Sequence, residues 1–279
     1  MNHTSTVPAA RTLEVPDARL HYELRGEGPV VVLVGAPMDA RSFAPLADLL
    51  AVDHTVLTTD PRGINRSRVD DPDQDSTPEM RADDLSRLLT HLDAGPAAVL
   101  GSSGGAVSAL ALVQAHPEQV HTVIAHEPPL EELLDDREQR RAAIDDIIAT
   151  YLSDGPAAAW AMFLAGANIT LPEDDGSGGP TPEPGERDRQ DVADEHHFFM
   201  HQLHATTRWQ PDTAGLRSAT TRILVGIGEQ SRGQTCDRTS TALAAALGIQ
   251  PSMFPGGHTG FAEDPDSFAI RLRAVLRES

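Results

Sequence analysis

Short apolar runs alternate with segments of helical spacing over most of this chain. The apolar runs that predict buried strands are residues 29–34, 54–59, 97–101, 120–126, 222–226 and 251–254, preceded by two shorter strands within 12–24. The segments with helical spacing are residues 42–50, 78–92, 105–116, 239–247 and 265–276. Near-continuous apolar strands that alternate with helices are typical of a parallel sheet buried on both faces. We therefore predict an α/β fold with a mostly parallel sheet of about eight strands.

The alternation breaks between residues 130 and 216. Helical stretches there, without a convincing strand, are residues 135–152, 157–165 and 191–206. Residues 171–189 are rich in Pro, Gly, Asp and Glu, a composition that predicts a mobile loop. The simplest organisation is one core domain formed by residues 1–129 and 217–279. A helical lid at 130–216 would then be inserted between the sixth and seventh strands.

Composition excludes several classes of function. All 22 basic residues are arginine, so neither a Schiff-base lysine for pyridoxal phosphate nor a lysine-bearing phosphate loop is available. The formal net charge of −20 argues against binding nucleic acid or an anionic membrane surface, because both need a positive footprint. Residues 226–231 resemble the opening of a dinucleotide fingerprint but lack its third glycine. We expect no cofactor and no nucleic-acid or membrane partner.

The cellular location is predicted from three features that the sequence does not show: a cysteine pair, a signal peptide and a membrane span. Its single cysteine, Cys236, cannot form an intramolecular disulfide and has no nearby base in the sequence, so we interpret it as structural in a reducing compartment. The first 11 residues do not have the pattern of a signal peptide. No apolar stretch approaches the roughly 20 residues that span a bilayer. A cytoplasmic location is the expectation, and the oligomeric state stays open.

A glycine-rich segment joins the predicted strand at 97–101 to the helix that follows. Residues 101–105 are Gly-Ser-Ser-Gly-Gly, so Ser103 has a glycine two positions before and two positions after it. Ser102 would need a glycine where Leu100 stands. A turn with this glycine spacing between a strand and a helix is a nucleophile elbow. Its sharp bend strains the central serine and leaves room only for small neighbours. The pattern predicts Ser103 as the nucleophile, with the N–H of Gly104 as an oxyanion donor.

The order and spacing of four segments resemble the motifs of the α/β-hydrolase fold family. They are residues 34–37 (Val-Gly-Ala-Pro), 60–67 (Asp-Pro-Arg-Gly-Ile-Asn-Arg-Ser), the elbow at 101–105, and 256–261 (Gly-Gly-His-Thr-Gly-Phe). Val34 replaces the family's usual histidine and Asn65 replaces a glycine. The resemblance covers nearly the whole chain. It implies His258, in the loop after the last strand, as the base that a serine hydroxyl needs. It also implies the backbone N–H of Ala36 as the second oxyanion donor.

The carboxylate of the triad is left open by the sequence. In most of the family it follows the seventh strand, but Ser231 occupies that position in this chain. Glu127, at the end of the sixth strand, lies 24 residues past Ser103. This spacing is similar to that of haloalkane dehalogenases and zearalenone-type lactone hydrolases. Glu229 and Asp237 remain alternatives. The acid would hold the histidine in one tautomer and stabilise the imidazolium formed during attack.

The predicted lid contains most of the aromatic residues. They would form the core of the lid or line the substrate pocket, and the candidate pocket residues are Met38, Trp160, Phe163, Phe199 and His201. Three histidines at 197, 201 and 204 would share a helix face and could in principle hold a metal ion. A polar face of the lid is the simpler interpretation, so we expect no metal site.

These observations predict a cofactor-independent serine hydrolase that cleaves a carboxylic ester or lactone of a small organic molecule through an acyl-enzyme. One alternative is a C–C bond hydrolase or a natural-product tailoring enzyme with the same triad. A second alternative is a catalytically inactive ligand-binding member of the fold, which the departure at Ser231 keeps open. A serine nucleophile argues against dehalogenase and epoxide-hydrolase chemistry, because the resemblance implies an aspartate for those reactions.

Overall fold

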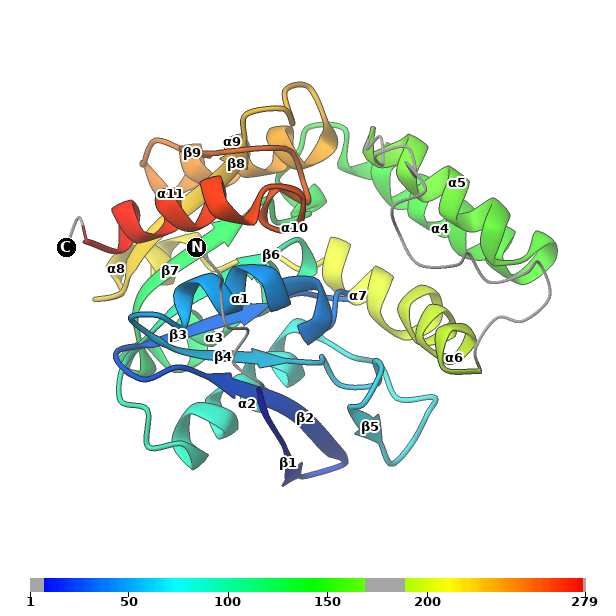
Figure 1. Ribbon diagram of the computed structural model, residues 1–279. Helices are drawn as coiled ribbons and strands as arrows, with labels where there is room; N and C mark the ends of the chain where they lie inside the picture. The colour runs from blue at the N-terminus through cyan, green and yellow to red at the C-terminus, as the bar shows by residue number, and fades with distance from the viewer. Residues whose placement is uncertain (1–7, 169–188, 278–279) are drawn as a thin grey trace.

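The sheet is the frame on which the other elements are arranged. The computed structural model describes residues 8–168 and 189–277, and within these ranges nine strands form one sheet (Figure 1). Its order is β1-β2-β4-β3-β6-β7-β8-β9, with β5 beside β2. The strands are β1 (Ala9–Val15), β2 (Ala18–Arg25), β3 (Val30–Val34), β4 (Thr55–Thr59), β5 (Arg68–Val69), β6 (Ala97–Ser102), β7 (Val120–His126), β8 (Arg222–Gly228) and β9 (Ser252–Phe254).

Strand direction agrees with the prediction. Strands β3, β4, β6, β7, β8 and β9 pair in parallel, and antiparallel pairing is confined to β2 with β1, β4 and β5. The predicted mostly parallel sheet is therefore confirmed. The strand that the sequence did not predict is β5, which has two residues and is too short to show any alternation.

Helices cover both faces of the sheet. The core helices are α1 (Ala44–Leu50), α2 (Pro78–His91), α3 (Gly104–Ala115), α8 (Thr213–Ser218), α9 (Thr235–Leu247), α10 (Gly260–Glu263) and α11 (Pro265–Arg277), and short 3₁₀ turns lie at Ala40–Phe43, Pro117–Gln119 and Glu131–Leu133. One apolar core contains Leu85, Leu110 and Leu243 from α2, α3 and α9. A second core, on the other face, contains Phe43 and Leu272. Helix α3 is buried continuously from residue 104 to 113, as expected for the central helix that follows the nucleophile elbow.

The segment between β7 and β8 is helical. It contains α4 (Arg137–Asp154), α5 (Pro156–Ala167), α6 (Arg189–His197), a π-helical turn (Phe198–Gln202) and α7 (Leu203–Thr207). Helices α4 and α5 pack together at one side of the sheet, and α6 and α7 lie below them in this view, with α7 next to the core (Figure 1). A small separate apolar cluster holds this segment together and includes Ile144, Ala159 and Phe199.

Several predicted boundaries differ from the observed ones. The single helix expected at 191–206 is interrupted by the π-helical turn, which hydrophobic spacing does not reveal. The expected lid boundary at 216 falls inside α8, whose Leu216 belongs to the main core. The loop expected at 171–189 lies outside the described residues, except for Arg189, the first residue of α6. Within the described ranges, no helix has both the length and the apolar character needed to cross a membrane.

Candidate active site

Ser103 lies in the turn between β6 and α3. Its backbone dihedrals are φ 55° and ψ −127°, which is a strained conformation for a residue with a side chain. A Cβ atom at Gly105 would overlap the carbonyl oxygen of Val34, and one at Gly101 would overlap that of Gly105. Both flanking positions therefore require glycine for a steric reason. The turn has the geometry that the elbow motif predicts.

His258 and Glu127 form a close pair although 131 residues separate them. The Nδ1 atom of His258 lies 2.6 Å from Oε2 of Glu127. The other carboxylate oxygen, Oε1, accepts a hydrogen bond of 2.7 Å from the N–H of Gly228. The Glu127 side chain is completely buried, whereas that of His258 is 15% exposed. Both oxygens of the buried carboxylate are thus hydrogen-bonded, as a buried charge requires.

The surroundings of Glu127 keep it ionised. Burial alone would raise the pKa of its carboxyl group, because it disfavours the charged form. The hydrogen bond from His258 and the neighbouring His126 and Ser231 outweigh that effect and hold the pKa well below its usual range. A permanently charged carboxylate against Nδ1 is the arrangement that fixes a catalytic imidazole tautomer.

The other two candidate acids lie elsewhere. Glu229 is exposed at the end of β8. Asp237 accepts a hydrogen bond of 2.8 Å from the N–H of Gly233 at the start of α9. Among the described residues, the carboxylate that pairs with His258 is that of Glu127. Ser231, at the position where the family usually has its acid, is buried and contributes to the low pKa of Glu127.

A cavity of about 200 Å³ lies above the elbow and is lined by both Ser103 and His258. Three of the predicted pocket residues, Met38, Trp160 and Phe163, line it. The apolar lining is completed by Pro37, Pro129, Leu164, Phe198 and Leu203. Within this lining, His258 is the residue that can carry a charge.

Phe199 and His201 are corrections to the predicted pocket. Phe199 is fully buried in the α4–α7 cluster and stacks on Tyr151 with 4.9 Å between ring centroids. The Nδ1 atom of His201 lies 3.3 Å from the carboxylate of Asp75. The π-helical turn widens the helix by one residue, so spacing rules for an α-helix assign its side chains to the wrong sides. Phe198, one of the lid aromatics but not one of the five candidate pocket residues, lines the cavity instead.

The two predicted oxyanion donors lie next to each other at the same cavity. Ala36 and Gly104 both line it, and a Cβ atom at Gly104 would come within 2.5 Å of the Ala36 carbonyl oxygen. Gly104 is the first residue of α3, where a backbone N–H has no partner within the helix. The helix start therefore provides a donor directed toward the space beside Ser103.

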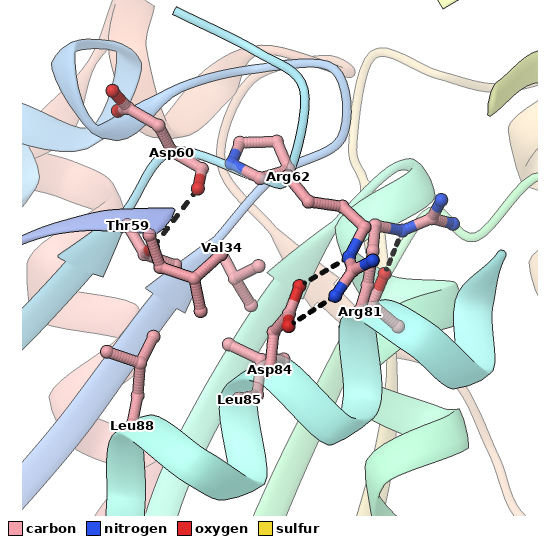
Figure 2. A pocket seen from close by; sticks show the side chains of 12 residues that line it. Val34, Thr59, Asp60, Arg62, Arg81, Asp84, Leu85 and Leu88 are labelled. Atoms are coloured by element: carbon pink, nitrogen blue, oxygen red, sulfur yellow. Dashed lines mark hydrogen bonds and ion pairs between the residues drawn. The ribbon is translucent and has the colours of Figure 1, made fainter. Parts of the chain in front are cut away.

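A buried arginine, which no sequence motif revealed, supports this region from behind. Arg81 Nε donates to Ser108 Oγ (2.8 Å), which in turn donates to the Gly104 carbonyl (3.1 Å). Arg81 Nη2 donates to Thr206 Oγ1 (3.0 Å), on the cavity wall. Burial lowers the pKa of Arg81 to about 9, so it is charged at neutral pH. Figure 2 shows Arg81 beside a second guanidinium, that of Arg62, which binds both oxygens of Asp84 at 2.8 Å.

The three regularly spaced histidines do not converge on one point. The His197 ring packs on Gly63, where an added Cβ atom would overlap it. His201 faces Asp75, and His204 Nε2 lies 2.7 Å from the carboxylate of Asp145. His201 and His204 thus have carboxylate partners, whereas His197 is buried.

Comparison with known proteins identifies the family. The family model described as alpha/beta hydrolase fold matches residues 28–182. The chain belongs to this family. It is 32% identical over 274 residues to the uncharacterized hydrolase YraK of Bacillus subtilis (strain 168), with 96% of each chain covered. It is 28% identical over 266 residues to a zearalenone hydrolase of Bionectria ochroleuca, covering 89% of this chain and 90% of that one.

Solved structures show the same fold. The structure titled Est816 as an N-acyl homoserine lactone degrading enzyme matches with a TM-score of 0.69 and 21% identity, covering 95% of this chain and 99% of that chain. At this identity the likeness concerns the fold alone. The predicted α/β-hydrolase fold is confirmed. The prediction that this chain is an enzyme, a hydrolase, is confirmed as well.

Proposed function

We propose that this α/β hydrolase cleaves carboxylic esters or lactones of small organic molecules through an acyl-enzyme. Ser103 is the nucleophile, His258 the general base and acid, and Glu127 the residue that orients His258. The main support is the 2.6 Å contact between His258 Nδ1 and Glu127 Oε2, made at a cavity that Ser103 and His258 both line. The proteins that the chain resembles include a zearalenone hydrolase, an N-acyl homoserine lactone degrading enzyme and a thermophilic esterase, which supports this substrate class.

The proposed mechanism follows from which nitrogen of His258 is engaged. Because Nδ1 donates its proton to Glu127, Nε2 has the lone pair that can accept the proton of Ser103 Oγ. The alkoxide attacks the substrate carbonyl, and the N–H groups of Ala36 and Gly104 bind the developing oxyanion. Collapse of this intermediate breaks the C–O bond, and the alkoxide leaving group takes the proton from His258. Water, deprotonated by Nε2, then hydrolyses the acyl-enzyme and restores Ser103. These steps use no cofactor.

The lining of the cavity supports a substrate that is uncharged near its carbonyl group. Trp160, Phe163 and Leu164 offer apolar surface, and the hydroxyl of Thr206 already accepts a hydrogen bond from Arg81. An anionic acyl group would find no arginine in this lining, only the catalytic His258, and would lose its hydration. The α5 and α7 helices supply much of the wall. We therefore propose that residues 130–216 act as a lid on a core formed by 1–129 and 217–279.

The decisive experiment is labelling with a fluorophosphonate probe, which reacts with an activated serine. Wild-type protein should label stoichiometrically and hydrolyse p-nitrophenyl esters, whereas Ser103→Ala should do neither. A panel of graded acyl chains and macrocyclic lactones would then define the substrate class. No labelling of wild type would favour the inactive binding protein. Labelling without hydrolysis of any ester or lactone would favour the C–C hydrolase or tailoring alternative. Labelling of Ser103→Ala would refute the assignment of the nucleophile.

A further inference from the structure

A thiol lies beside the acid and the base of the proposed triad. Within residues 8–168 and 189–277, one group of three side chains could hold a metal ion, namely Glu127, Cys236 and His258. One ligand atom from each lies within 4.8 Å of the other two. Cys236 is only 6% exposed. Three separate elements bring these groups together, since Glu127 follows β7, Cys236 is in the first turn of α9 and His258 follows β9.

We propose that these three residues form an inhibitory site for a thiophilic divalent cation such as Zn²⁺ or Cd²⁺. Thiolate, imidazole and carboxylate are the ligands that proteins use for zinc, and three of them leave a fourth position for water. The charges balance in this buried place. The carboxylate contributes one negative charge, and the thiol contributes a second after releasing its proton to solvent. Together they neutralise the dication, while the imidazole stays neutral.

Binding would require a small movement of His258. Ligand atoms around a tetrahedral zinc ion lie about 3.5 Å apart, as bond lengths of roughly 2.0–2.3 Å dictate. The His258 and Glu127 atoms are 2.6 Å apart, so the cation must separate them and replace their hydrogen bond. His258 is the residue able to move, because it lies in a loop and is partly exposed, whereas Glu127 and Cys236 are buried.

The cation would switch off the base by changing its tautomer. Neutral imidazole carries one ring proton, which the contact with Glu127 places on Nδ1. A cation on Nδ1 takes that lone pair and leaves the single proton on Nε2. Nε2 then becomes a donor and cannot accept the proton of Ser103. The inhibitory consequence rests on the proposed function, but binding of the cation does not.

The principal alternative is adventitious binding at the surface. The chain has 42 acidic residues, which attract hard cations such as Mg²⁺ without involving sulfur. His204 and Asp145 form an exposed pair of one nitrogen and one oxygen ligand, to which zinc can also bind. Both possibilities are separable from the proposal because Cys236 is the only thiol in the sequence.

The test is a titration of chelator-free, thiol-free protein with Cd²⁺, recording the ultraviolet charge-transfer band of the cadmium–thiolate bond. We expect the band in wild type and in His204→Gln, its absence in Cys236→Ala, and a weaker apparent affinity in Glu127→Gln. In parallel, Zn²⁺ should inhibit hydrolysis of a p-nitrophenyl ester, EDTA should restore it, and Mg²⁺ should have no such effect. Loss of the thiolate should raise the inhibitory Zn²⁺ concentration by more than the roughly 10–100-fold that loss of an outer partner costs.

Each outcome decides the proposal. Absence of the band in folded wild-type protein would overturn it. An unchanged cadmium midpoint in Glu127→Gln would show that the carboxylate is not a ligand and would also overturn the three-residue site. Equal Zn²⁺ sensitivity of wild type and Cys236→Ala, each relative to its own metal-free rate, would assign inhibition to the surface. Cys236→Ser replaces the alanine variant if that one does not fold. The band needs no catalysis, so it tests the site even if the proposed hydrolysis fails.

Discussion

His258 is hydrogen-bonded to Glu127, at the end of β7, and not to a residue after β8. The two strands are neighbours, with Ala125 opposite Val225, so a carboxylate at either strand end lies near the loop that carries the histidine. Glu127 is fixed between them. Its N–H donates to the Gly226 carbonyl (3.0 Å), and its Oε1 accepts from Gly228. Glu127 makes these hydrogen bonds with its backbone in the left-handed region (φ 52°).

The first prediction concerns this carboxylate. Glu127→Gln keeps the shape of the side chain but removes the charge that holds His258 in its productive tautomer. We expect kcat to fall by about 10⁴-fold, as in a serine triad whose acid is replaced by its amide. Steady-state kinetics on an activated ester would measure the loss, with thermal melts at the same pH to verify folding.

The matched control is Glu229→Gln, which alters the exposed candidate acid. Because Glu229 is exposed and the carboxylate bound to His258 in the described chain is that of Glu127, replacing Glu229 should change kcat by far less. If Glu229→Gln abolished turnover and Glu127→Gln retained most of it, the acid would lie after β8. The contact seen at Glu127 would then have no part in catalysis.

The sequence predicted what depends on local spacing and left open what depends on distance in space. The elbow could be recognised because the glycines around Ser103 are required by neighbouring backbone. The sequence favoured Glu127 as the acid but kept Glu229 and Asp237 as alternatives, because adjacent strand ends both offer a carboxylate and spacing along the chain does not show which one reaches His258. The pocket was partly misassigned because the sequence does not show which lid aromatics face the cavity: Phe198 lines it, whereas Phe199 is buried in the lid cluster. Arg81 was missed because two of its partners, Ser108 and Thr206, come from distant segments of the chain.

The second prediction tests the glycine requirement. Gly105→Ala would place a Cβ atom against the Val34 carbonyl, where only backbone could give way. We expect loss of folded protein or a large drop in Tm, since neither strand nor helix can shift without disturbing the core. The control is Gly166→Ala in α5, where an added Cβ atom meets nothing within 4 Å. That variant should gain roughly 0.5–1 kcal/mol from helix propensity. Equal melting temperatures for both variants would contradict the packing argument.

The third prediction separates cavity wall from structural core. Phe163→Ala enlarges the cavity, so kcat/KM for bulky acyl groups should rise relative to short ones, by roughly 10–200-fold if the space of a methylene or more is gained. Phe199→Ala should leave the acyl preference unchanged. Because Phe199 is fully buried, its loss should instead cost about 3–5 kcal/mol of folding free energy. A panel of p-nitrophenyl esters and a denaturant titration provide the two readouts. A change of acyl preference in Phe199→Ala alone would reverse the assignment.

The last prediction concerns acid stability. Burial, with the nearby His201, Arg81 and Arg62, lowers the pKa of His197 from 6.5 to about 4. His197 is therefore protonated near pH 6.5 in the unfolded chain, but only near pH 4 in the folded protein. Stability is full above pH 6.5 and falls as the pH decreases toward 4, by about 2 kcal/mol at pH 5 for this one residue.

His197→Gln should remove this contribution and so reduce the dependence of stability on pH. Between pH 7 and pH 5, its Tm should fall by roughly 3 °C less than that of wild type, given the unfolding entropy of a chain of 279 residues. The control His204→Gln, an exposed histidine on the neighbouring α7, should follow the wild-type curve. The difference in slope is the readout, because His197→Gln also loses packing against Gly63 and has a lower Tm at every pH. Parallel curves for wild type and His197→Gln would mean that His197 is not held neutral in the folded protein.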